Sequence, residues 1–340
     1  MILTSPSTLL GAAVVLAAGA SAQYALVDNY DITNFFTEGF SFFSDPDPTH
    51  SFVRYAKAQD ASDAQLAGYA DGAVYLGVDH RTGPDGVAGG RPSTRVTSNK
   101  AYTRGLFVAD IAHMPAGCGV WPAFWTVGPA WPAGGEIDIV ENVNSATTTQ
   151  VTLHTAPGCS VDASGSRNDS RPLDADCNAD NAHKGCAVST ADPRTFGAGF
   201  NAAGGGVYVA EWTSQAISVW FFARGSPEAA ALAALNGTAG PDVAALGAPV
   251  ARFGGCDFDA HFRDHRLVFN TALCGDWAGQ PQVWASDATC APLAATCDDY
   301  VRQNPAAFAE AYWLVNRVSV YQLPADAGAA QERKGRRFVA

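Results

Sequence analysis

The sequence predicts an all-β protein on three observations. Gly and Pro are abundant, at 34 and 19 of 340 residues, which favours a turn-rich chain. Strand-length runs of β-branched and aromatic residues recur between stretches of Gly, Pro, Asn and Asp. Helical patterns are few. Because 47% of the residues are hydrophobic and only 16% are charged, the chain can fill a core and does not belong to the disordered class.

The predicted strands follow one another along the whole chain. They cover residues 51–55, 73–78, 106–111, 150–154, 207–212, 217–222, 267–270 and 313–321. Only four residues separate the fifth run from the sixth, so this pair is the clearest hairpin. Two short helices are expected, one from Ser226-Pro227 to Leu235 and one after Asn304-Pro305 over residues 306–312. The polar stretch 159–186 predicts a long surface loop.

The ends of the chain differ in composition from its middle. Residues 1–22 are uncharged, with an apolar stretch followed by Ala20-Ser21-Ala22, as in a secretory signal peptide cleaved after Ala22. A membrane anchor is the alternative, but no other apolar segment is long enough to span a bilayer. Residues 23–322 have no dividing linker and predict one domain. The tail 323–340 has no apolar period and is expected to be disordered.

Secretion decides how the cysteines and two asparagines are interpreted. An even number of cysteines in an oxidising compartment predicts up to four disulfides, with the pairing left open. The cysteines are Cys118, Cys159, Cys177, Cys186, Cys256, Cys274, Cys290 and Cys297. A zinc site is the alternative, with His183 and Cys186 as its best local ligands. Asn168 and Asn236 begin Asn-x-Ser/Thr triplets and are candidate glycan acceptors.

The net charge argues against two classes of binding partner. The formal charge is −12, whereas binding to nucleic acid or to an anionic membrane requires a clustered basic face. We therefore expect neither partner.

The segment from Glu136 to Glu141 carries the chemistry. Glu136 and Asp138 alternate with isoleucines, so in a strand the two carboxyls share one face. Strict alternation would turn Glu141 to the apolar face. A β-bulge near residues 139–140 returns it to the face of the other two. Crowded carboxyls repel one another, which raises the pKa of at least one, and glycoside hydrolysis requires one ionised and one protonated carboxyl.

An acidic strand can also be a plain solvent-exposed face, so its surroundings matter. Two glycines precede Glu136 and let another group approach the backbone closely. Tryptophans are concentrated just upstream, at Trp121, Trp125 and Trp131. Because indole faces stack on the apolar faces of sugar rings, tryptophans beside carboxyls indicate a saccharide cleft. Trp125 and Trp131 are the first candidates for sugar platforms, whereas Trp121 fits a core or a cleft equally well.

Four segments together resemble glycoside hydrolase family 16, and within it the fungal laminarinase-type endo-β-1,3(4)-glucanases. They are residues 117–125 (GCGVWPAFW), 134–144 (GGEIDIVENVN), 152–155 (TLHT) and 269–279 (FNTALCGDWAG). The resemblance implies a β-jelly-roll sandwich of two curved antiparallel sheets, the concanavalin A-like lectin/glucanase fold, with the glycan cleft on a concave face. The E-x-D-x-x-E spacing is similar to that of the laminarinase branch, whose catalytic strand is bulged.

The resemblance also implies roles for the acidic trio. Glu136 would be the nucleophile, Glu141 the general acid and then base, and Asp138 the residue that tunes Glu136. Retention of configuration follows if the two glutamate carboxyls lie about 5–5.5 Å apart.

Further positions match the family around this trio. His154 matches a histidine close to the carboxyls, with a satisfied structural histidine as the alternative. Arg95 matches a cleft arginine, with a surface salt bridge as the alternative. Trp277 and the loop 45–50 are weaker candidates for sugar subsites.

The expected function is a secreted endo-β-glucanase that cuts internal β-1,3 or mixed β-1,3/1,4 bonds of laminarin-like glucans. A cell-wall transglycosylase and a non-catalytic glucan-binding protein on the same fold are the alternatives. The substrate partner would be a β-glucan, and the protein is expected to be a monomer. No cofactor or catalytic metal is needed; a structural calcium ion, which some family members contain, is left open.

Overall fold

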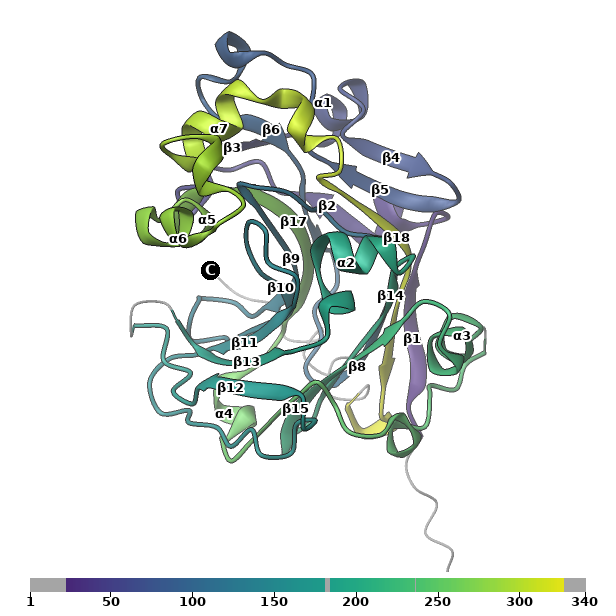
Figure 1. Ribbon diagram of the computed structural model, residues 1–340. Helices are drawn as coiled ribbons and strands as arrows, with labels where there is room; N and C mark the ends of the chain where they lie inside the picture. Colours follow the sequence, from purple (N-terminus) through teal and green to yellow (C-terminus); the bar gives the residue numbers. More distant parts are fainter. Residues whose placement is uncertain (1–22, 181–183, 236, 327–340) are drawn as a thin grey trace, which may run out of the picture.

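The computed structural model describes residues 23–180, 184–235 and 237–326, and its strands form two large sheets that pack face to face (Figure 1). The sheet called the front sheet here has the spatial order β12 (Ser170–Asp174), β13 (Cys186–Thr190), β11 (Gln150–His154), β10 (Glu136–Glu141), β9 (Val120–Val127), β17 (Arg266–Leu273), β7 (Arg95–Ser98) and β2 (Phe40–Phe42). Its pairings are all antiparallel.

The second sheet, called the back sheet, is also antiparallel. Its order is β16 (Ala251–Gly254), β15 (Ala216–Ala223), β14 (Gly206–Trp212), β8 (Gly105–His113), β18 (Tyr312–Gln322), β5 (Ala73–Gly77) and β4 (Ala67–Ala70), with β1 (Ala25–Tyr30) also on β18. A separate parallel pair joins β3 (Val53–Tyr55) to β6 (Arg91–Ser93). The predicted all-β sandwich of two antiparallel sheets is therefore confirmed.

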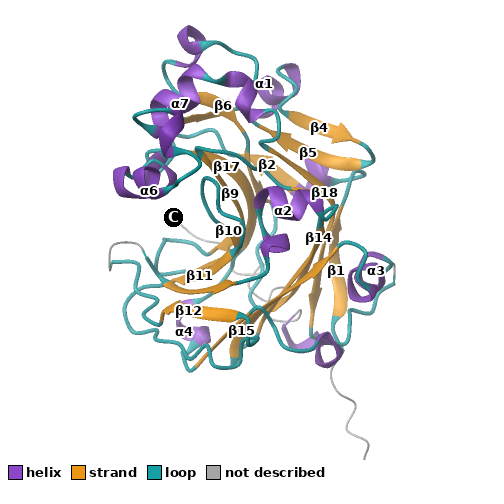
Figure 2. Cartoon of the chain, viewed as in Figure 1, coloured by secondary structure: helices purple, strands orange, loops and turns teal. Residues whose placement is uncertain are grey.

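Helices lie at the margins of the two sheets (Figure 2). The α-helices are α1 (Ala58–Asp63), α2 (Gly197–Ala202), α3 (Pro227–Ala233), α4 (Phe258–His261), α5 (Gly275–Ala278), α6 (Pro281–Ser286) and α7 (Cys297–Gln303). Shorter turns are a π-helical one at Phe35–Gly39 and 3₁₀ turns at Pro84–Val87, Pro193–Thr195, Val243–Leu246, Ala291–Leu293 and Pro305–Phe308. No helix among the described residues is both long enough and apolar enough to cross a bilayer.

The main core lies between the two sheets and explains the alternating sequence pattern. Side chains from alternate positions of each strand point inward, and Phe124 of β9 stacks on Phe269 of β17 at 4.3 Å between ring centroids. Ile137 and Ile139 of β10 are buried in the same cluster. Burial of these side chains removes apolar surface from water and holds β10 in the centre of the front sheet.

The predicted hairpin and the first predicted helix are confirmed. β14 and β15 pair from Trp212 opposite Ile217, and the Ser226 side chain accepts a hydrogen bond from the amide of Ala229 at the start of α3. The second predicted helix is wrong beyond its first turn. A 3₁₀ turn ends at Phe308, and Tyr312 begins β18. Pairing with β5 across the sheet outweighs the local helical preference there.

The four predicted disulfides are present. They join Cys118 to Cys290, Cys159 to Cys256, Cys177 to Cys186 and Cys274 to Cys297. The zinc alternative is wrong for Cys186, whose sulfur is bonded to Cys177; His183 lies outside the described residues. The polar stretch 159–186 is stapled as expected, but it is not all loop, because it contributes the edge strand β12.

Several predictions concern the ends of the chain and its surface. The predicted signal peptide at residues 1–22, most of the predicted disordered tail and Asn236 lie outside the described residues. The domain boundary predicted at Gln322 coincides with the end of β18, and just beyond it Asp326 pairs with Arg104 at 3.0 Å. Asn168 is exposed in a turn, where its glycosylation stays a prediction.

Candidate active site

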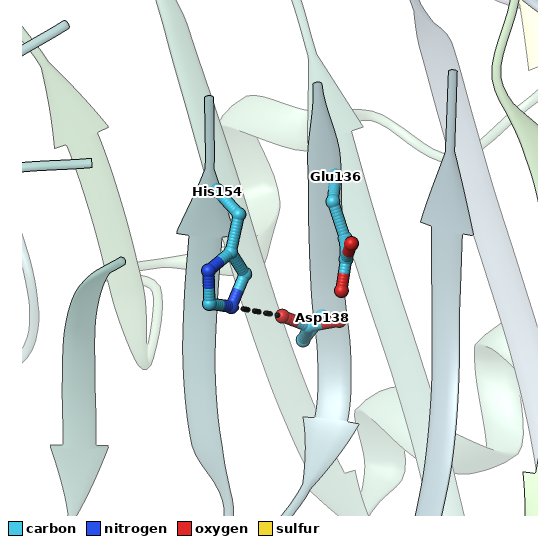
Figure 3. Close-up of side chains that lie close together, drawn as sticks. All are labelled: Glu136, Asp138 and His154. Carbon is cyan, nitrogen blue, oxygen red and sulfur yellow. Dashed lines mark ion pairs between the residues drawn. The ribbon is translucent and has the colours of Figure 1, made fainter. Parts of the chain in front are cut away.

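The predicted β-bulge is confirmed and sets the direction of Glu141. Across the pairing of β10 with β9, Asp138 lies opposite Trp125 and Val140 lies opposite Phe124. Ile139 is therefore the extra residue, and Glu141 comes to lie opposite Ala123. Since Trp125 and Ala123 share a face of β9, Asp138 and Glu141 share the corresponding face of β10. Glu136 shares this face by alternation, and its side chain lies beside that of Asp138 (Figure 3).

Burial raises the pKa of all three carboxyls, and the charge of Asp138 adds to this effect on both glutamates. Burial, followed by the charge of Asp138, raises the pKa of Glu136 to about 8. Burial raises the pKa of Asp138 to about 7, opposed by a hydrogen bond with Glu136. Burial and the charge of Asp138 also raise the pKa of Glu141 well above its ordinary value. The trio therefore keeps protons at a pH where isolated carboxyls are ionised.

Each glutamate accepts a hydrogen bond from an indole. Trp131 Nε1 donates to Glu136 Oε2, and Trp121 Nε1 donates to Glu141 Oε1 at 2.7 Å. Trp131 is 44% exposed and Trp121 is half-buried. Both indoles favour the ionised form of the carboxylate that they hold. Two of the tryptophans expected to stack on sugar thus also contact the acidic trio directly.

His154 lies beside the trio on β11. It is directly opposite Glu136 in the register, and its Nε2 lies 3.3 Å from Asp138 Oδ2 (Figure 3). Gly185 lies close to the ring, and a Cβ there would come within 2.8 Å of His154 Nδ1. The positive charge of a protonated His154 would lower the pKa of both glutamates.

Arg95 of β7 and Trp125 of β9 lie to one side of the trio, on strands that flank β17. Trp125 Nε1 donates to Asn270 Oδ1 at 2.7 Å. The Arg95 guanidinium lies over two rings, 4.3 Å from the centroid of Phe43 and 5.0 Å from that of Trp125. Its Nε has no hydrogen-bond partner among the described residues. The surface salt bridge considered for Arg95 is not formed within the described part of the chain.

Sequence reasoning missed three residues around Arg95. Asn270, Phe43 and Tyr55 form its surroundings, with the Asn270 amide donating to the Tyr55 hydroxyl at 3.3 Å. Only Asn270 left a signal in the sequence, as a polar residue that ends the apolar run 267–269. Phe43 and Tyr55 come from distant segments that only the folded sheet brings together.

The two weaker subsite candidates lie next to each other. Trp277 of α5 packs edge-to-face on Trp121, with 5.7 Å between the centroids. The preceding residue, Asp276, pairs with His50 of the loop 45–50 at 2.9 Å and donates its amide to Thr49 O. This loop, which runs from Asp45 to His50, therefore lies beside α5.

The two glycines before Glu136 lie where other groups approach the backbone closely, as predicted. Gly135 has a φ of +80°, and a Cβ there would lie 2.5 Å from Phe262. A Cβ at Gly134 would lie 2.3 Å from the carbonyl oxygen of Pro129. The close approach is therefore made by the protein's own chain and not by a ligand. His265, whose pKa is lowered to about 4 by burial, donates from Nε2 to Gly134 O and fixes this turn.

One group of described residues could hold a small cation. Ligand atoms of Glu136, Asp138 and His154 all lie within 4.8 Å of one another. The acid and base chemistry of the carboxyls does not require such an ion.

The raised pKa of Glu136 predicts how stability changes with pH. The folded state keeps this proton up to about pH 8, whereas an unfolded glutamate releases it near 4.5. The folded state therefore binds more protons between these values, and the free energy of unfolding falls as the pH rises through them. Glu136→Gln should raise Tm by a few °C at pH 8.5 and leave it unchanged at pH 4.

Thermal unfolding of both proteins at the two pH values checks this expectation. The exposed Glu38 provides the control, since Glu38→Gln should change Tm equally at both. An equal Tm shift at pH 4 and 8.5 for Glu136→Gln would contradict the raised pKa.

Comparisons with known proteins agree with one another. The family profile described as "XgeA-like, catalytic GH16 domain" matches residues 40–321. An endo-1,3(4)-beta-glucanase of Arthroderma benhamiae is 44% identical over 94% of this chain and 68% of its own length. A protein of Aspergillus clavatus, named "Probable endo-1,3(4)-beta-glucanase", is 42% identical over 90% of this chain and 47% of its own. The chain thus spans about half the length of that relative.

Two solved structures resemble the whole sandwich. Laminarinase 16A of Phanerochaete chrysosporium, bound to 6-O-glucosyl-laminaritriose in donor and acceptor sites, is 36% identical with a TM-score of 0.82. An elongating β-1,3-glucosyltransferase is 38% identical with a TM-score of 0.79. Each alignment covers 88% of this chain and all of the other.

Proposed function

The chain belongs to glycoside hydrolase family 16, and from that premise we propose that it is a retaining endo-β-glucanase. It hydrolyses internal β-1,3 or mixed β-1,3/1,4 glucosidic bonds of laminarin-like glucans. The observation that carries the proposal is the bulge at Ile139, which brings three carboxyls to one face of β10 beside half-buried and exposed tryptophans.

Glu136 is the nucleophile in the first step. Its oxygen attacks the anomeric carbon, while the bond from that carbon to the leaving oxygen breaks and Glu141 gives its proton to that oxygen. The division of roles follows the family pattern, because the charge of Asp138 raises the pKa of both glutamates. The indole of Trp131 and a protonated His154 favour the ionised form that Glu136 needs as a nucleophile.

Water completes the reaction in the second step. The ionised Glu141 now takes a proton from water, whose oxygen attacks the anomeric carbon and releases Glu136 as a carboxylate. Two displacements at one carbon restore its original configuration. Asp138 exchanges a hydrogen bond with Glu136 as the charge on that glutamate appears and disappears.

An uncharged polysaccharide suits the face that carries the trio. Trp125 and Trp131 offer indole surface to sugar rings. Arg95 is held against two rings, and we propose that its guanidinium contributes to sugar binding beside them. We also propose that the protein is secreted, that it acts as a monomer on extracellular glucan, and that it requires no cofactor.

Product profiles on three glucans test the proposed function. Purified protein is incubated with laminarin, lichenan and a branched β-1,3/1,6-glucan, and the products are separated by chain length over time. Oligosaccharides of several lengths should appear early from laminarin, with the β-anomer formed first by NMR. Release of glucose alone, or an α-anomer as the first product, would contradict the proposal.

Glucosyl transfer is the second candidate, because the elongating glucosyltransferase is 38% identical over 88% of this chain. In transfer, a sugar hydroxyl takes the place of water in the second step. The same assay at high oligosaccharide concentration separates the two, since products longer than the substrate would be the main outcome of transfer. A purely glucan-binding protein would release no product at all.

A further inference from the structure

The hydrogen bond between Trp121 and Glu141 follows from the bulge. Glu141 lies opposite Ala123 on β9, so Trp121 is its diagonal neighbour, two residues away on the same face. Diagonal neighbours in an antiparallel sheet lie within reach of a long aromatic side chain. The indole Nε1 meets Glu141 Oε1 at 2.7 Å. Without the extra residue at Ile139, the carboxyl would point into the core and the bond could not form.

An indole can only donate a hydrogen bond. Oε1 of Glu141 is therefore an acceptor in both protonation states. Because the carbonyl oxygen of a carboxylic acid accepts more strongly than its hydroxyl oxygen, the bond favours a proton on Oε2 over one on Oε1. The indole N–H does not titrate in the range of the carboxyls, so this preference holds throughout the catalytic cycle.

Trp121 is itself held in place from two sides. Trp277 packs edge-to-face against it. Trp277 lies on α5, whose N-cap residue Cys274 forms the disulfide with Cys297. Asn144, just beyond the end of β10, connects these parts. Its side chain accepts from the amide of Gly119 at 2.9 Å and donates to Ala278 O at 3.0 Å. The start of β9, the end of β10 and α5 thus form one cross-linked frame.

We propose that Trp121 is a positioning residue for Glu141, which selects the carboxyl oxygen that carries the transferable proton and promotes ionisation of the carboxyl after transfer. This inference rests on the proposed function and deepens it. It gives Trp121 a role different from both the core position and the sugar platform that the sequence left open.

The charges around Glu141 give the direction of the effect. Asp138 and Glu136 on its own strand oppose its ionisation, whereas His154 on β11 favours it when protonated. On α5, Asp276 is paired with the exposed His50 and is not among these influences. The Trp121 bond also favours the carboxylate. Its removal should therefore raise the pKa of Glu141 and extend the basic limb of the pH–rate profile.

Two substitutions at Trp121 separate the N–H from the ring. Trp121→Phe removes the donor and part of the ring, and replacement by 3-benzothienylalanine keeps the ring shape but puts sulfur in place of N–H. With laminarin oligosaccharides, both should lower kcat about tenfold and move the basic limb up by about one pH unit. KM should stay within about twofold of the native value, since the sugar contacts are not the target.

Trp220 supplies the matched control. It lies on β15 of the back sheet, and its Nε1 donates to Gly247 O at 2.8 Å. The same two replacements there remove an indole bond of similar length far from the trio, and the pH profile should not move. Thermal unfolding of all variants checks that they are folded.

A titration without substrate distinguishes this inference from the proposed function. Carbon-13 NMR of the glutamate carboxyls follows Glu141 directly, with Glu141→Gln used for assignment. A higher pKa in the benzothienylalanine protein would support the positioning role even if no glucan were hydrolysed. An unchanged Glu141 pKa, or a raised KM with an unmoved basic limb, would overturn it and make Trp121 a sugar platform.

Discussion

Glu136→Gln is expected to lower kcat on laminarin by about 10⁴-fold or more, because glutamine cannot form the covalent intermediate. The substitution changes little in shape, and the amide oxygen can still accept from Trp131. KM should change far less than kcat. Reducing-end release measured over a long incubation at high protein concentration gives the residual rate.

Glu211→Gln is the matched control for this loss. Glu211 lies on β14 of the back sheet and accepts a hydrogen bond from the Tyr24 hydroxyl at 3.0 Å. Its replacement makes the same chemical change outside the trio, so activity should remain near the native level. Substantial hydrolysis by a folded Glu136→Gln protein would exclude Glu136 as the nucleophile.

Glu141→Ala is expected to lose about 10²- to 10⁴-fold on laminarin, because both proton transfers lose their donor or acceptor. The loss should be much smaller in the first step for a substrate with a dinitrophenolate leaving group, which departs without protonation. The glycosyl-enzyme should then accumulate, since no base activates water. Azide needs no base, so it should accelerate turnover about tenfold or more and give a β-glycosyl azide.

The configuration of the azide product separates the two glutamates. In Glu136→Ala, azide would enter the space of the missing nucleophile and give the α-glycosyl azide instead. Failure of azide to accelerate Glu141→Ala, with the activated substrate bound normally, would contradict the assignment of Glu141. NMR of the purified products decides the anomer.

Local pattern predicted the bulge in β10 correctly because two constraints conflict there. Alternation places Glu136 and Asp138 on one face, and a buried charge at Glu141 is unfavourable. One extra residue resolves the conflict, and Ile139 is that residue in the structure.

The four disulfides were predictable in number but not in pairing, because pairing depends on which loops the fold brings together.

Other features depend on contacts between distant segments and could not be read from local sequence. Phe43 and Tyr55 reach Arg95 only through the packing of separate strands. Gly135 resembled a site of ligand approach, but the neighbour that excludes a Cβ is Phe262, more than a hundred positions away. Tyr312 was predicted to end a helix but begins β18, because it pairs with Gly77 of β5 in the back sheet.

The two halves of the site are held by different parts of the fold. Glu136 follows a turn that His265 holds in place through a hydrogen bond from its Nε2 to Gly134 O. His265 is the residue just before β17. Glu141 is next to the frame that Asn144 and the Cys274–Cys297 disulfide build around α5. The proposed nucleophile and the proposed acid are therefore positioned separately, on either side of the bulge.

Covalent trapping tests the central claim most directly. The protein is incubated with a 2-deoxy-2-fluoro-laminaribiosyl fluoride, whose good leaving group allows the intermediate to form while fluorine slows its hydrolysis. Intact mass should increase by one fluoroglycosyl group, and peptide mapping should place that group on Glu136. A label on another residue, or no label while the reagent is consumed, would contradict a double displacement through Glu136.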